Sequence, residues 1–406
     1  METLSKEISR RNFYAFIWHA SLLAVAKNFM DVDTVIPSML INAGGTQLHV
    51  GILTAIMIGG SSFTQLLFAP TVSGASRKKP LLLGGISLRI LSLAGTGFLF
   101  LGIQSFGPSM LIVFIFIIIS IFSISGAFAN LPFTDILGKS ILEDQRKRFF
   151  SLRQIISSAG IFASAFLVRE ILSRQSYPDN YARVFFLAAG FLFMASLGFW
   201  MLKEYIPKDH TPVKQSFKDV WRELKHNRRL QYFLISINTL GLGIGILPFV
   251  LLYSGAHREL SSQFIGNLLI AKTLGLILAG LWLFSRGKKV RYHRMMETMV
   301  VLGLFAVAFA WGFPGLGFSY LLSFFAGGLF LSLYQIISSG VLLEISSLQN
   351  RSLYTAIAGA GSILPVLFPL FGGALIGWIG FHVFFALYAC FMAISVIFIH
   401  RLNCQK

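Results

Sequence analysis

Five ionisable residues interrupt apolar stretches that are long enough to cross a membrane. Lys27, Asp31 and Asp33 lie close together near the N-terminus, and Arg89 and Lys272 follow further along the chain. A charged side chain at the centre of a bilayer costs about 2.5–3.5 kcal/mol on insertion scales, so each needs a partner or a watery cavity. These residues are therefore the first candidates for binding an ion or a charged solute.

The acids near the N-terminus could carry a proton. Lys27 and Asp31 are spaced i, i+4, which puts both on one face of a helix. This pair is either a static ion pair or a coupling site, in which a solute that takes over Lys27 changes how Asp31 holds a proton. Asn28 lies beside Lys27 on the same broad face. Asp33 lies about 200° round the helix from Asp31, so the two acids face different surroundings, and Asp33 is either a second coupling acid or a hydrated outer group.

Lys272 lies near the middle of its apolar stretch, and no acid is visible at similar depth in the second half of the sequence. A lone base suggests an anion-binding group, with the anion supplied by a solute or by an acid across a cavity. Snorkelling or a structural pair between the halves is the alternative.

The composition predicts an all-α integral membrane protein. Of 406 residues, 55% are hydrophobic and only 12% are charged. This charged share is about half that of a soluble domain. Four stretches without charge, 34–76, 90–134, 298–343 and 352–400, are each split by turn residues, at 42–45, 107–109, 312–315 and 377–380. Each stretch is long enough for two helices. About twelve spans are expected. The placements are 13–41, 48–72, 80–103, 109–136, 152–172, 183–202, 230–255, 261–285, 294–312, 318–343, 353–376 and 381–400.

The positive charge sets the topology. With both termini in the cytoplasm, the outer loops hold only Arg169, Arg174, Arg183 and Arg258. The other loop arginines and lysines then face inside, as they do in most membrane proteins. The net charge of +18 is therefore a topology signal and not a nucleic-acid surface. The chain is expected in the plasma membrane, the inner membrane of the cell, as a multi-pass monomer.

Weak internal repeats divide the chain into two pseudo-symmetric six-helix bundles. Three short matches share one offset of about 200 positions, as expected for a transporter built from two repeats. They pair Arg183–Phe186 with His382–Phe385, Gln145–Arg148 with Gln349–Arg351, and Ile36-Pro37 with Leu247-Pro248. The predicted bundles are 1–203 and 230–406. Between them, 204–229 is a basic amphipathic stretch, either an interfacial helix on the cytoplasmic face or a plain tether.

This organisation resembles the Major Facilitator Superfamily, over the whole chain. The family's loop between helices 2 and 3 reads G-x-x-x-D-R-x-G-R/K-R/K, and here Pro70–Lys79 keeps only the final basic pair. Gly74 and Ala75 replace the family's acid and arginine. The resemblance implies a cytoplasmic gate at Arg77, Lys78 and Lys79, with Asp135 as a partner for Arg77 or Lys78. The first helix, with Asp33–Pro37, is similar to the family's acidic helix that ends in proline.

The resemblance also implies which helices line the cavity. They are the predicted helices 13–41, 109–136, 230–255 and 318–343, whose uncharged polar candidates are Asn130, Asn238, Tyr334 and Gln335. Each of these could instead join helices by hydrogen bonds. Arg89, in a peripheral helix of the resembled fold, is expected in a structural pair inside the N-terminal half.

The predicted function is secondary active transport by alternating access, driven by an ion gradient, namely protons, with no cofactor and no metal. Asp31 and Asp33 would couple proton movement to transport, and Lys27 and Lys272 would bind a small anionic or zwitterionic organic solute from two sides. A proton/drug antiporter that exports lipophilic cations is the alternative. A polytopic membrane enzyme and a solute sensor that does not transport are alternatives from other classes, but no catalytic motif supports an enzyme.

Overall fold

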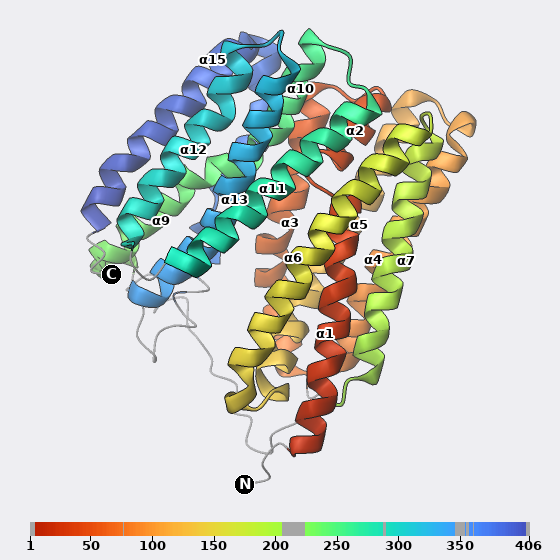
Figure 1. Ribbon diagram of the computed structural model, residues 1–406, viewed down its shortest axis with the longest axis vertical. Helices are drawn as coiled ribbons and strands as arrows, with labels where there is room; N and C mark the ends of the chain where they lie inside the picture. The colour runs from red at the N-terminus through yellow and green to blue at the C-terminus, as the bar shows by residue number, and fades with distance from the viewer. Residues whose placement is uncertain are drawn as a thin grey trace. The chain divides into compact units, whose positions relative to one another are not determined.

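The computed structural model describes residues 5–75, 77–204, 224–286, 290–345, 354, 357–359 and 361–402, and these residues form helices joined by short loops (Figure 1). No strand occurs among them. The helices are α1 (Lys6–Phe29), α2 (Val35–Asn42), α3 (Gln47–Gly74), α4 (Lys79–Leu101), η1 (Ile103–Ser105), α5 (Pro108–Ser140), α6 (Glu143–Arg174), α7 (Asp179–Met201), α9 (Arg228–Gly241), η2 (Leu242–Gly245), α10 (Leu247–His257), α11 (Ser262–Arg286), α12 (Tyr292–Gly312), α13 (Gly317–Ile345) and α15 (Leu364–Leu402). The predicted linker falls largely on 205–223, outside the described residues.

Nine helices of the described part are long and apolar enough to cross a membrane, judged by length and composition. They match the predicted spans from 80–103 to 318–343, and the ninth, Ile357–Leu402, covers both of the last two predictions. Gly380 separates those two, with φ 77° and ψ 169°. Glycine adopts this conformation without a steric penalty. The turn predicted at 377–380 is therefore present inside α15.

The predicted continuous helix 13–41 is wrong. The chain leaves the helix between Met30 and Thr34, so that α1 and α2 are separate helices. Pro37, in the first turn of α2, explains the break, because proline lacks an N–H and its ring clashes with the carbonyl four residues earlier. The same happens before Pro248, where η2 separates α9 from α10.

The chain packs as two compact units, each with its own core. The first comprises Met1–Asp31, Asn42–Gly44 and Gly60–Val213, and the second comprises Val32–Ile41, Gly45–Gly59 and Lys214–Lys406. α2 and the beginning of α3 thus pack with the second unit, although the predicted division at 203 assigned them to the N-terminal bundle. The break after α1 coincides with the passage of the chain from one unit to the other.

Aromatic residues fill the first unit. α1 packs against α6 and α7, and α4 packs against α5 and α7 (Figure 1). Phe13, Phe16, Phe149 and Phe199 are buried in this core. Their rings meet mostly edge to face. Aromatic pairs favour this arrangement over face-to-face stacking.

Helices of the second unit touch backbone to backbone at small residues. A Cβ at Gly328 of α13 would overlap the carbonyl oxygen of Lys272 in α11. Pro365 and Pro369 of α15 lie against Gly241 and Gly245, where a Cβ would overlap the proline rings. Close approach through small residues is how membrane helices gain packing energy without help from water.

Candidate functional site

The break between α1 and α2 places both candidate acids on non-helical backbone. Asp31 follows the end of α1, and Asp33 lies in the turn just before α2. The helical geometry that put Asp31 on the face of Lys27 therefore does not apply, and neither does the angle assigned to Asp33. Lys27 lies in the last turn of α1 and is exposed.

Asp33 and Lys272 form a buried ion pair inside the second unit. The Lys272 Nζ donates to Asp33 Oδ2 over 2.7 Å. The side chain of Asp33 is 8% exposed and that of Lys272 is 5% exposed. The pair joins the turn before α2 to the middle of α11. The base that had no visible acid nearby in the sequence thus has one from the first part of the chain, 239 positions away.

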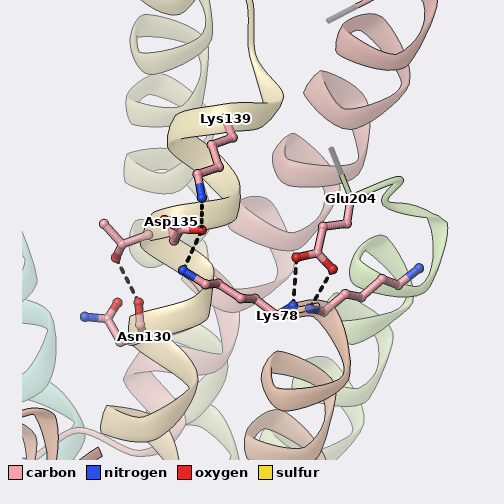
Figure 2. A network of polar contacts seen from close by, with 7 residues as sticks. Lys78, Asn130, Asp135, Lys139 and Glu204 are labelled. Carbon is pink, nitrogen blue, oxygen red and sulfur yellow. Dashed lines mark hydrogen bonds and ion pairs between the residues drawn. The ribbon is translucent and has the colours of Figure 1, made fainter. Parts of the chain in front are cut away.

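A second charged network surrounds the loop before α4, in the first unit (Figure 2). Lys78 is buried, and its Nζ lies 3.0 Å from Asp135 Oδ2; the Nζ of Lys139 reaches the same oxygen over 2.8 Å. Lys78 is one of the two partners that the resemblance implied for Asp135. Arg77, the other, is exposed, and the described residues include no salt bridge from it.

Glu204, which the sequence reasoning missed, completes this network. Its carboxylate accepts the backbone N–H groups of Lys78 over 2.7 Å and of Lys79 over 3.0 Å (Figure 2). These N–H groups are at the N-terminus of α4, which has no cap from the side chain at its own N-cap position. A helix N-terminus leaves N–H groups unbonded and favours a negative charge. The ammonium group of Lys79 in turn donates to the carbonyls of Trp200 and Leu202. The loop is thereby fastened to both α5 and the end of α7.

Two of the polar candidates use their side chains to join helices. The Asn28 side chain is buried and donates to the Ile161 carbonyl and to Ser164 Oγ of α6. The Tyr334 hydroxyl donates to the Ile237 carbonyl over 3.0 Å. These groups serve helix packing, the alternative that the sequence left open for Tyr334.

Asn238 supports a non-helical stretch ahead of α15. Its amide donates to the Leu234 and Gly361 carbonyls over 2.8 and 2.7 Å, and its Oδ1 accepts the Leu364 N–H over 2.9 Å. Both ends of the side chain are therefore engaged. Asn130 and Gln335, in contrast, are exposed.

A cavity of about 140 Å³ lies within the first unit. It is lined by Phe16, His19, Ala20, Leu23, Leu82, Ile86, Arg89, Gly126, Ala129, Asn130, Phe133, Phe149, Arg153 and Phe199. Two arginines and one histidine are among these residues, and none of them is acidic. His19 donates from Nδ1 to the Ala195 carbonyl over 3.1 Å and stacks on Phe199 at 3.8 Å between ring centroids. Asn130 is the one predicted binding residue that the structure places at this cavity.

The structural pair expected for Arg89 is not found among the described residues. The Arg89 guanidinium lies 4.3 Å from the centroid of the Phe122 ring, and its buried Nε has no hydrogen-bond partner in the described part of the chain. Arg153 and His19 were not singled out from the sequence. Arg153 directly follows a basic loop, where an arginine is ordinary at a membrane boundary.

Solved structures share this architecture over nearly the whole chain. A mutant of the nucleoside transporter NupG has a TM-score of 0.66 and 12% identity, with 98% of this chain and 100% of that chain covered. A peptide transporter POT in complex with sulfate has a TM-score of 0.70 and 10% identity, with 98% and 96% covered. A D-xylose–proton symporter has a TM-score of 0.67 and 14% identity, with 96% and 97% covered. The chain has the fold of the Major Facilitator Superfamily. No family model and no curated protein matches its sequence.

The two halves of a Major Facilitator Superfamily fold are parallel repeats. Similar local features recur in the two halves of this chain. The breaks at 30–34 and 242–246, and the prolines that follow them, occupy corresponding places in the two halves. The bond from Asn28 to the Ile161 carbonyl has a counterpart in the bond from Asn238 to the Gly361 carbonyl. Corresponding interrupted helices in the two halves are the feature that best marks a transporter's binding region.

Proposed function

We propose that this protein is a secondary active transporter that moves a small organic solute by alternating access. The solute is anionic or zwitterionic, and protons drive the cycle. The buried pair between Asp33 and Lys272 carries the proposal, because it unites a carboxylate that can take a proton with a cation that can take an anion.

The energetic cost of burying this ion pair favours a functional role for it over a purely structural one. Removing two charges from water costs several kcal/mol per ion, and apolar residues of similar volume often stabilise a protein as well or better. Charged residues in membrane spans commonly serve ion or substrate pathways. Protonation of Asp33 would remove its negative charge and release Lys272, and an anionic solute would compete with Asp33 for the same ammonium group.

The position of Asp33 links this exchange to movement. The chain passes from the first unit to the second between Asp31 and Val32, within the broken segment. A ligand shifts a conformational equilibrium only if it interacts differently with the two states. Making and breaking a contact on this segment supplies such a difference. Asp31, on the same segment, is the second candidate for proton coupling.

Lys27 is the proposed first contact for the solute. It is an exposed cation in the last turn of α1, next to the broken segment. Gln335 is an exposed amide that stays a candidate for a polar contact with the solute, whereas Asn130 lines the cavity of the first unit. Asn28, Asn238 and Tyr334 are assigned to helix packing, since their side chains are already bonded.

We assign the cytoplasmic gate to the network of Lys78, Asp135, Lys139 and Glu204. It lies at the loop where the resembled family has its gating motif. Asp135 and Glu204 supply there the negative charge that the loop itself lacks, since Gly74 stands in place of the family's acid. The working protein is proposed to be a multi-pass monomer of the plasma membrane that needs no bound cofactor.

The test is solute-dependent proton flux. Purified full-length protein is reconstituted in liposomes that contain a pH-sensitive dye, and solutes are added outside. The probes are small organic carboxylates, amino acids, dipeptides, nucleosides and pentoses, with lipophilic cations for the antiporter alternative. Acidification of the lumen by an anion or zwitterion supports the proposal. Alkalinisation driven by lipophilic cations alone, or no flux with any probe from correctly folded protein, contradicts it.

A further inference from the structure

The cavity of the first unit has an excess of positive charge. Arg89 comes from α4 and Arg153 from α6, and both line the same space of about 140 Å³. No lining residue is acidic. Two guanidinium groups at one cavity call for a negative charge, because unpaired cations inside a membrane protein are costly.

Three acids of the first unit have contacts elsewhere. Asp135 binds Lys78 and Lys139, Glu204 caps α4, and Glu170 pairs with Arg174 on the exposed side of α6. None of these three lines the cavity. The residues that line the cavity therefore supply positive charge and no counter-charge.

The Arg89 guanidinium is held ready for a ligand. One face lies against the Phe122 ring, and the absence of a side chain at Gly126 leaves room beside it, since a Cβ there would lie 2.9 Å from the guanidinium. Its buried Nε has no hydrogen-bond partner among the described residues. Buried donors are nearly always bonded, so an orphan in a cavity wall indicates a missing acceptor. A planar guanidinium matches a carboxylate with two parallel hydrogen bonds.

The other residues that line the cavity favour a ligand whose remaining part is apolar. Phe16, Phe133, Phe149 and Phe199 line the cavity, and Asn130 adds one amide. A cavity of about 150 Å³ accommodates a single benzene ring. We infer that this cavity binds a small aromatic or apolar monocarboxylate, with its carboxylate on Arg89 and Arg153 and its body among the phenylalanines. This site is separate from the pair of Asp33 and Lys272, and the inference does not require transport.

The test is equilibrium binding to the purified full chain in detergent, measured by calorimetry. The probe is benzoate, and benzamide and inorganic phosphate are the comparisons. The variants are Arg89→Gln and Arg153→Gln, with Arg183→Gln as the matched control, because Arg183 is an exposed arginine of α7 outside the cavity. Benzoate is expected to bind wild type and Arg183→Gln equally. Each cavity variant is expected to bind benzoate about tenfold or more weakly, and wild type to bind benzamide as weakly.

Four results would overturn the inference, three of them with wild type. Those three are no binding of benzoate by wild type, equal binding of benzoate and benzamide, and tighter binding of phosphate than of benzoate. Unchanged benzoate affinity in Arg153→Gln would also overturn it. Size-exclusion profiles and melting curves verify that each variant is folded. If Arg89→Gln does not fold, Arg153→Gln decides the question, because Arg153 makes no hydrogen bond or salt bridge within the described part of the chain. Binding with no flux in liposomes would keep this site and reject the proposed transport.

Discussion

Removing one partner of the buried pair should destabilise the protein far more than removing both. Asp33 and Lys272 approach to 2.7 Å. With an effective dielectric constant of about 20, their attraction is about 6 kcal/mol, much of it offset by lost hydration. Removal of one partner leaves a buried charge uncompensated, at a cost of about 3–5 kcal/mol. Lys272→Met and Asp33→Asn should each lower the free energy of unfolding by about that amount. The double variant should lie within about 1 kcal/mol of wild type, because an uncharged pair leaves no buried charge.

The assay is a double-mutant cycle on unfolding in mixed detergent micelles, followed by tryptophan fluorescence and circular dichroism. The control cycle removes Glu170 and Arg174, an exposed i, i+4 pair on α6. The coupling of such a pair should be about 0.3–0.5 kcal/mol. The reasoning requires a coupling energy of about 5 kcal/mol or more for Asp33 and Lys272. A coupling as small as that of the control, or single variants no less stable than the double variant, would refute it.

Three further predictions concern packing and helix ends, and each is measured as a change in the free energy of unfolding. The added Cβ of Gly328→Ala overlaps the Lys272 carbonyl, whereas Gly84 has open space around its Cβ position. Gly328→Ala should therefore destabilise by about 1–3 kcal/mol, and Gly84→Ala should be neutral or stabilise by up to about 1 kcal/mol; equal effects would contradict the observed contact of α11 and α13. Asn238→Ala leaves the Gly361 carbonyl and the Leu364 N–H unbonded, and should cost about 1–3 kcal/mol. Exposed Asn130→Ala should change stability by about 0.5 kcal/mol or less, and a cost there as large as at Asn238 would count against the assigned roles. Glu204→Ala removes the acceptor for two N–H groups of α4. It should cost about 0.5–2 kcal/mol, as loss of an N-terminal cap does, and Glu204→Gln should retain part of that stability; identical losses would show that hydrogen bonding by Glu204 is unimportant.

Local features of the fold could be predicted from the sequence because they depend on nearby residues. Charge-free runs predicted most spans, and the turns at 107–109 and 377–380 were visible as glycine and proline. The break at 30–34 was missed because the apolar residues on both sides of Asp31 and Asp33 were assigned to one helix. Pro37 was interpreted as a helix end, although a proline in the first turn of a helix predicts a break shortly before it. Applied to Pro37 and Pro248, that rule predicts both helix breaks from the sequence.

The side-chain partners depended on contacts distant in sequence. Nothing local to Lys272 indicates that its acid is Asp33, 239 positions away. Glu204 was assigned to the linker by its polarity, and its role as a cap of α4 is visible only when the ends of α4 and α7 meet. Arg153 was hidden in a basic boundary, where charge is expected for reasons of topology. Residue type alone therefore identified which charges were unusual, but not what they bind.

The most direct test of proton-coupled transport through Asp33 separates driven uptake from exchange. Once a transported solute has been found, its accumulation under an inward proton gradient and its counterflow without a gradient are measured in liposomes for wild type and Asp33→Asn. The account predicts that Asp33→Asn loses accumulation and retains counterflow, because a side chain that cannot take up the coupling proton can still permit exchange of bound solute. Accumulation by Asp33→Asn equal to that of wild type would contradict the assignment of Asp33 as the coupling group.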